Sequence, residues 1–144
     1  MQKKIITGDA LRGSEKVNLD DELKDAPVVA YYFSAHWCPP CRNFTPKLVE
    51  KYKEWNKDGK KIEVVFMSFD QDEDQFKEYF GTMPWLAIPH GDSRIDQIAA
   101  KYKANSIPRL VIVDKDENAL TDKGVQDLHQ SEAKAVDNWK ALYK

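Results

Sequence analysis

Three apolar runs mark the strongest pattern along this chain. They lie at residues 28–33, 62–68 and 110–113, and they are apolar at nearly every position, as is typical of central strands that are covered on both faces. Helical spacing fills the segments between them, which favours β-α-β crossovers and a parallel pair at the centre of a sheet. Residues 114–119 have the composition of a reverse turn between two strands. The pattern therefore predicts an α/β fold, with a mixed central sheet flanked by helices on both faces.

The helical segments are predicted from the recurrence of apolar side chains. One stripe at positions i, i+4, i+8 and i+11 belongs to a long helix that ends near residues 58–59: Phe44, Leu48, Tyr52 and Trp55. The same spacing predicts shorter helices around residues 76–80, 95–102 and 135–143. Ser131 is of the residue type that caps a helix N-terminus, so it is predicted to cap the last of these helices.

Size and composition restrict the class of protein. The chain has 144 residues, and we expect a single domain over residues 1–144. Twenty-two basic residues against 24 acidic ones give a formal charge of −2, which argues against a nucleic-acid partner. Apolar residues make up 42% of the chain, enough for a core, yet no run approaches the ~20 residues that span a bilayer.

The start of the chain and the use of cysteine predict a location. Residues 1–8 lack the long apolar stretch of a secretory signal, and only two cysteines are present, too few for the disulfide framework of a small secreted domain. We therefore expect a cytoplasmic protein, with the nucleus as a second compartment, that acts as a monomer without a membrane partner.

The candidate chemistry lies in the segment Trp37-Cys38-Pro39-Pro40-Cys41, between the first predicted strand and the long helix. A thiolate, not a thiol, attacks a disulfide. A helix N-terminus offers unsatisfied N–H groups and the positive end of the helix dipole, and both favour a thiolate there. Cys38 is therefore the predicted nucleophile. Cys41 lies one helical turn further on, within reach for a disulfide with Cys38.

The two prolines between the cysteines fit the first turn of a helix, which tolerates proline. Pro39 and Pro40 are expected to stiffen this turn and to remove two N–H donors near the sulfurs.

Two other interpretations of the cysteine pair are weaker. A zinc site needs about four ligands, and His36 is the only nearby candidate beyond the cysteines. A purely structural disulfide is unusual in a cytosolic chain. No metal and no cofactor are therefore predicted.

A second element of the predicted site is Ile107-Pro108, directly before the third strand, where a proline is tolerated only at the start of the strand. A cis bond before Pro108 would leave the backbone of Ile107 free to bind an extended substrate segment beside the sulfurs.

At these residues the sequence resembles the thioredoxin superfamily, and within it the nucleoredoxin and tryparedoxin branch. The resemblance covers roughly residues 15–120, and it is carried by residues 32–42, Phe44-Thr45-Pro46, Met83-Pro84-Trp85-Leu86-Ala87-Ile88-Pro89 and Ser106-Ile107-Pro108. It implies a thioredoxin fold and dithiol–disulfide exchange. It also implies the roles of single residues: Cys38 as the attacking cysteine, Cys41 as the resolving cysteine, Pro108 as the cis-proline and Trp37 as a shielding aromatic.

The chain departs from the family pattern in two places. Thioredoxins carry a buried Asp six residues before the first cysteine and a Lys on the neighbouring strand, where this chain has Tyr32 and Phe66. The proton acceptor for the resolving thiol is then water or the Tyr32 hydroxyl. Tryparedoxins hold trypanothione with a Glu and an Arg. At the position of the Glu this chain has Phe69-Asp70-Gln71, and around residues 124–127, the position of the Arg, it has no arginine. These departures favour the nucleoredoxin-like interpretation.

Three further side chains leave alternatives open. Arg109 follows the predicted cis-proline and either faces the thiolate, binds an acidic partner or is a solvated side chain. Trp85 either forms a flat apolar patch with Trp37 or belongs to the core. His36 either favours the thiolate of Cys38 or is an exposed loop residue. The predicted substrate-binding set is Trp37, Pro39, Pro40, Trp85, Ile107, Pro108 and Arg109.

The predicted function is that of a thiol–disulfide oxidoreductase, an enzyme that reduces protein disulfides through Cys38 and Cys41. An upstream thiol reductant would restore the dithiol. The resemblance implies redox regulation, with signalling or transcription-regulating proteins among the substrates. The alternative hypothesis is a binding module, in which the redox state of the two cysteines changes the surface around Trp37, Trp85 and Pro108 and no turnover occurs.

Overall fold

The computed structural model describes residues 5–104 and 106–143. Residues 1–4, the beginning of the segment tested above for a secretory signal, lie outside the described residues, as do residues 105 and 144 of the predicted 1–144 domain. None of the helices within the described ranges is long and apolar enough to cross a membrane.

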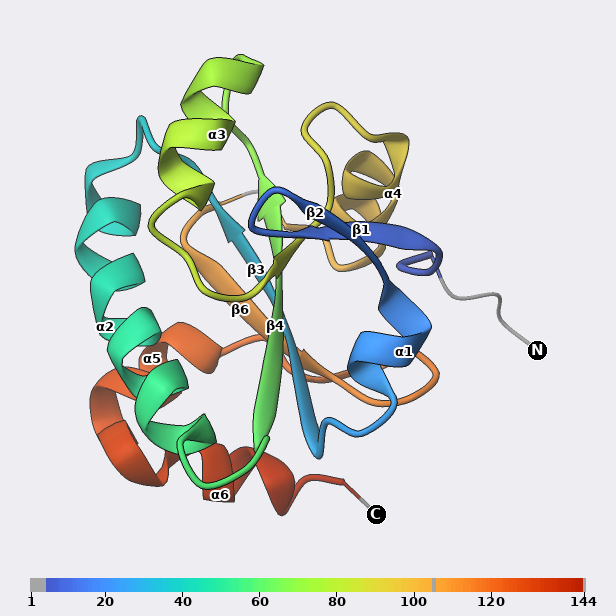
Figure 1. Ribbon diagram of the computed structural model, residues 1–144. Helices are drawn as coiled ribbons and strands as arrows, with labels where there is room; N and C mark the ends of the chain where they lie inside the picture. The colour runs from blue at the N-terminus through green and yellow to red at the C-terminus, as the bar shows by residue number, and fades with distance from the viewer. Residues whose placement is uncertain (1–4, 105, 144) are drawn as a thin grey trace.

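A mixed sheet of seven strands forms the middle layer, in the order β2-β1-β5-β4-β3-β6-β7 (Figure 1). The strands are β1 (Asp9–Arg12), β2 (Glu15–Asn18), β3 (Val28–Ser34), β4 (Ile62–Ser68), β5 (Leu86–Ala87), β6 (Arg109–Val113) and β7 (Ala119–Thr121). β3 pairs in parallel with β4 and antiparallel with β6. The predicted parallel pair at the sheet centre and the predicted hairpin at residues 114–119, which joins β6 to β7, are confirmed.

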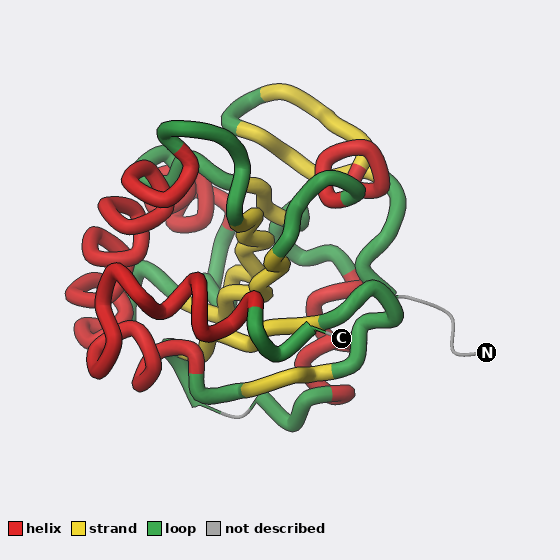
Figure 2. Tube along the Cα trace, turned by 90° about the horizontal axis from the view of Figure 1, so that it is seen from below, coloured by secondary structure: helices red, strands yellow, loops and turns green. Residues whose placement is uncertain are grey.

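Helices cover both faces of this sheet, as predicted (Figures 1 and 2). α2, α3, α5 and α6 share one apolar cluster with the sheet, whereas α4 and the segment around α1 pack into a second cluster on the opposite face. Both faces of the central strands are therefore buried, which is why β3 and β4 are apolar nearly throughout. The helices are α1 (Leu19–Leu23), α2 (Pro39–Asn56), α3 (Glu73–Phe80), α4 (Ser93–Lys101), α5 (Gly124–Ser131) and α6 (Ala135–Lys140), with a 3₁₀ turn, η1 (Glu132–Lys134), between the last two.

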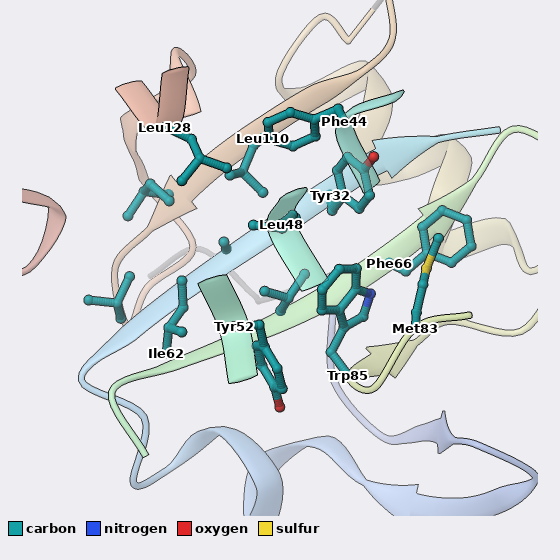
Figure 3. Packing of buried hydrophobic residues seen from close by; sticks show 14 of the residues in the cluster. Tyr32, Phe44, Leu48, Tyr52, Ile62, Phe66, Met83, Trp85, Leu110 and Leu128 are labelled. Atoms are coloured by element: carbon teal, nitrogen blue, oxygen red, sulfur yellow. The ribbon is translucent and has the colours of Figure 1, made fainter. Parts of the chain in front are cut away.

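Trp85 belongs to the core and not to the surface. Its side chain is fully buried, and its ring packs edge-on against Tyr32 and Tyr52, at centroid distances of 6.0 and 5.5 Å (Figure 3). The prediction that Trp85 contacts substrate beside Trp37 is therefore wrong, because the ring fills the space between the sheet and α2. Burial of so large an apolar side chain stabilises the fold.

Several elements were not predicted because few of their residues are buried. The β1–β2 hairpin is an edge of the sheet in which only Ala10 is fully buried, so it has no apolar run. α5 was missed for the same reason, since its buried residues are only Gly124 and Leu128. Ser131 does not cap α6, whose cap position is occupied by Lys134. Ser131 instead ends α5 and stands at the N-cap position of η1, where its side chain makes no capping hydrogen bond.

Candidate active site

Both cysteines lie where β3 gives way to α2. Cys38 is the N-cap residue of α2, in an extended conformation with φ −100° and ψ 109°, and Cys41 lies in the first turn. Both thiols are free. Cys38 is 6% exposed and Cys41 is completely buried, and the two pack together in one cluster with Ala35. The predicted placement of the pair at the start of a helix is confirmed.

The two prolines occupy the first positions of α2. Since proline has no N–H group, the first backbone donor of the helix belongs to Cys41. The next one, Arg42 N–H, donates to the Cys38 carbonyl oxygen at 3.1 Å. Pro39 and Pro40 are both exposed, so they form the outer surface of the turn, and their role in substrate binding stays a prediction.

The peptide bond between Ile107 and Pro108 is cis, as predicted. The backbone before β6 lies next to the site, with the Ile107 carbonyl oxygen 3.9 Å from Cys38 Sγ. Ile107 also packs against the two cysteines, together with Phe69. Segments that are about 70 residues apart in sequence therefore meet at the nucleophilic sulfur.

Trp37 is the exposed aromatic side chain of the site. Trp37 is 49% exposed, and its indole N–H donates to the carbonyl oxygen of Phe69 at 3.0 Å. Phe69 in turn packs against the cysteine cluster. The preceding residue is held by Asp70, whose carboxylate accepts from the His36 backbone N–H at 2.6 Å. The His36 ring packs against Tyr79, with a centroid distance of 5.5 Å.

A groove of about 460 Å³ opens next to the cysteine motif, between the N-terminal half of α2 and α5. It joins the exposed Pro40 to Pro108 and extends away from the sulfurs toward polar side chains. Its lining is Pro40, Asn43, Phe44, Lys47, Pro108, Val125, Gln126 and His129. The sequence pattern did not identify the α5 part of this lining, because the fold alone brings α5 beside α2.

Arg109 is directed along the surface. Its guanidinium lies 3.4 Å from the Asp122 carboxylate and donates to the Ser106 hydroxyl at 3.2 Å. Of the three alternatives left open for Arg109, these contacts support neither a charge aimed at the thiolate nor a freely solvated side chain. A role of Arg109 in binding an acidic partner stays a prediction.

Cys41 is the more deeply buried of the two cysteines. Burial raises the pKa of Cys41 to about 12, and the neighbouring Cys38 thiol contributes to the rise. Two groups act in the opposite direction and lower this pKa: the Ser34 hydroxyl and the Ala35 backbone. Cys41 is therefore a thiol at neutral pH in the reduced protein.

Buried hydroxyl groups lie behind Cys41, where the sequence had indicated only Tyr32. The Tyr32 hydroxyl lies 2.6 Å from that of Thr45, Thr45 lies 2.5 Å from Tyr79, and Tyr79 lies 2.6 Å from Ser34. Tyr32 and Phe66, the predicted counterparts of the thioredoxin Asp and Lys, pair in register on β3 and β4. A sequence signal for Thr45 existed, since it follows Cys41 by four residues and shares its helix face.

No group of three or more potential metal-ligating side chains that could hold a metal ion occurs within residues 5–104 and 106–143.

Comparison with known proteins agrees with this geometry. Residues 26–119 match the family model described as Thioredoxin-like. Nucleoredoxin of Bos taurus is 40% identical to this chain over 123 residues. The match covers 85% of this chain and 28% of that protein, so the chain spans less than a third of the length of this curated relative.

Solved structures give the same result over nearly the whole chain. Tryparedoxin from Trypanosoma brucei superimposes with a TM-score of 0.82 at 33% identity, covering 92% of each chain. Thioredoxin from Wuchereria bancrofti superimposes with a TM-score of 0.81 at 34% identity, covering 97% of this chain and 99% of that one. The predicted thioredoxin fold is confirmed.

Proposed function

This chain belongs to the thioredoxin-like family, and on that premise we propose that it is a thiol–disulfide oxidoreductase that reduces disulfides in protein substrates. The observation that carries the proposal is the arrangement of the two free thiols at the start of α2, with Cys38 6% exposed and Cys41 completely buried in the same cluster. This arrangement separates an attacking sulfur from a resolving one.

The first step is the attack of Cys38 on the substrate. The Cys38 thiolate forms a bond to one sulfur of the substrate disulfide, and the other substrate sulfur leaves as a thiolate, which takes up a proton. The start of α2 supports this step through the dipole of an 18-residue helix. The product is a mixed disulfide between Cys38 and the substrate.

The second step releases the substrate. The Cys41 sulfur attacks Cys38 Sγ, a Cys38–Cys41 disulfide forms, and the bond to the substrate breaks. Two electrons have then passed from the dithiol to the substrate, which leaves with both sulfurs reduced. An upstream thiol reductant returns two electrons to the disulfide and restores Cys38 and Cys41.

The groove beside the site supports polypeptide substrates. It begins at Pro40 and Pro108, next to Cys38, so residues that flank a substrate cysteine would lie along it toward His129. The exposed Trp37 ring offers an apolar contact near the same sulfur. By analogy with the nucleoredoxin relatives, we propose a redox-regulatory role in the cytoplasm or nucleus, with signalling or transcription-regulating proteins as the substrate class.

Reduction of insulin disulfides tests this function. The unaltered chain should reduce insulin with a thiol reductant present, and Cys38→Ser should show essentially no catalysis, because the attacking sulfur is lost. Matched melting curves for the two proteins exclude misfolding as the cause. A normal rate in Cys38→Ser would contradict the mechanism.

Cys41→Ser keeps the attacking sulfur and removes the resolving one, so it should accumulate a mixed disulfide with its substrates. Incubated in a lysate of the source organism, Cys41→Ser should capture proteins that a reducing agent releases. The doubly substituted Cys38→Ser/Cys41→Ser chain is the matched control and should capture none of them by a disulfide.

The alternative of a binding module without turnover is not favoured by the family to which the chain belongs. The two hypotheses differ in a measurable way. A partner that binds the doubly substituted chain as tightly as the unaltered one, together with no insulin reduction by the unaltered chain, would support the binding module.

A further inference from the structure

Four buried hydroxyl groups meet beside the resolving cysteine: those of Tyr32, Ser34, Thr45 and Tyr79, here called the hydroxyl cluster. We propose that this hydroxyl cluster stabilises the thiolate of Cys41 while it resolves the mixed disulfide. In this proposal Ser34 donates to the reacting sulfur, and Tyr79 and Thr45 are positioning residues. The inference rests on the proposed function, since it concerns the second step of that reaction.

Three elements bring the cluster together. Tyr32 and Ser34 lie on β3 and point to the same face, Thr45 lies on α2 one turn after Cys41, and Tyr79 comes from α3. All four side chains are at most 3% exposed. Water therefore does not compete for their hydrogen bonds, and each hydroxyl depends on its neighbours.

A count of the hydroxyl protons shows that the cluster has one O–H group left to donate. Four hydroxyl groups carry four protons, whereas they form three oxygen–oxygen pairs, at 2.6, 2.5 and 2.6 Å. Each pair uses one proton, so one O–H remains for a group outside the cluster. If every hydroxyl donates toward Ser34, the free O–H lies on Ser34. The next residue, Ala35, packs in one cluster with Cys41, and Ser34 lowers the pKa of Cys41. Donors aligned in one direction also polarise one another.

The reaction needs this donor at one moment. In the resolution step Cys41 loses its proton, its sulfur bonds to Cys38 Sγ, and the substrate sulfur departs with the electron pair of the broken bond and takes up a proton. The developing thiolate is buried, where negative charge is unfavourable. In the mixed disulfide Cys38 no longer carries a thiol proton or a charge, which removes two influences that oppose ionisation of Cys41, while Ser34 and Ala35 remain as donors.

The test separates the two steps in the full chain. The aromatic disulfide DTNB reacts with reduced protein and releases one coloured TNB thiolate when Cys38 attacks and a second when Cys41 resolves the mixed disulfide. In Ser34→Ala we expect the second release to slow about tenfold at neutral pH, which corresponds to about 1.4 kcal/mol of lost thiolate stabilisation. The first release should stay within about twofold of the unaltered chain.

Matched variants keep the test informative if one of them folds poorly. Tyr79→Phe removes a hydroxyl from the cluster, whereas Tyr143→Phe removes one that donates to the Val113 carbonyl oxygen and accepts from Val29 N–H, at the far end of β3. Tyr79→Phe should slow only the second release, about threefold as an indirect effect, and Tyr143→Phe should slow neither. Ser34→Thr retains a hydroxyl and should recover most of the rate that Ser34→Ala loses.

The outcomes are distinct. An unchanged second release in folded Ser34→Ala and Tyr79→Phe would overturn the role of the cluster, and so would an equal slowing of both releases, which indicates a structural effect. A single TNB release from the unaltered chain, together with no insulin reduction, would instead overturn the proposed function. Selective slowing of the second release, with recovery in Ser34→Thr, supports the inference.

Discussion

Gly124 is the residue whose replacement by alanine should most clearly perturb the wall of the groove. It begins α5, where that helix packs onto β6. A Cβ atom at this position would lie 2.7 Å from the Leu110 carbonyl oxygen and 2.8 Å from the Leu110 Cβ and Cγ atoms. Ordinary van der Waals contact begins near 3.4 Å, so α5 would have to move away from the sheet by about 0.7 Å.

The cost follows from this overlap. Overpacking in a well-packed interior destabilises a protein by about 1–3 kcal/mol, and the obstacle here includes the backbone of a central strand, which cannot rotate away. Unfolding entropy for a chain of this length is about 0.3 kcal/mol per kelvin. Gly124→Ala should therefore lower the melting temperature by about 3–10 °C. Displacement of Val125 and Gln126, which follow Gly124 in the groove lining, should also raise KM for insulin more than it lowers kcat.

The assay is thermal unfolding followed by circular dichroism, with insulin kinetics on the same preparations. Gly81→Ala is the matched control. Gly81 caps α3 with an ordinary φ of −58°, and a Cβ there would meet its nearest atom at 3.3 Å, so its melting temperature should change by no more than about 2 °C. If Gly124→Ala has the same melting temperature as Gly81→Ala and an unchanged KM for insulin, the close approach of α5 to β6 does not determine the shape of the groove.

Three further predictions concern single side chains. Iodoacetamide should label Cys38 in the reduced native chain and spare Cys41, because Cys41 is fully buried and burial raises its pKa to about 12; equal labelling by mass spectrometry would contradict the assigned order of attack. Trp85→Ala should cost about 3–5 kcal/mol in denaturant unfolding, whereas Trp37→Ala, at an exposed ring, should change stability by less than about 1 kcal/mol and raise KM for insulin; the reverse pattern would show that the two rings have been assigned the wrong roles. Arg94 hydrogen-bonds Asp92 and holds the pKa of that carboxyl below its usual range. Ionised Asp92 therefore stabilises the fold above its unfolded pKa, and this contribution is lost as the pH falls through the lower folded pKa. The stability of Asp92→Asn should fall less steeply with acid below about pH 4, and the same pH dependence of stability in both proteins would exclude that contribution.

The central sheet was predictable because a strand that is buried on both faces is a continuous run of apolar residues in the sequence. β3 and β4 are covered on both faces, and each appears as an apolar run within one residue of its observed bounds. The stripe of α2 is likewise local, since four apolar positions on one helix face identify it. The β1–β2 hairpin left no such mark, because an edge hairpin with one fully buried residue has an ordinary polar sequence.

The chemistry of the site divides in the same way. The cysteine pair, its place at a helix start and the proline before β6 are short-range features, so the residue order determined them. The position of Trp85 was not determined, because an aromatic residue suits both a core and a binding surface, and only packing against Tyr32 and Tyr52 decides between them. The groove and the hydroxyl cluster join residues from β3, α2, α3 and α5. The packing of helices onto the sheet determines which of these side chains become neighbours. Because they are far apart in sequence, no local sequence pattern indicates that they meet, and only the tertiary structure decided these contacts.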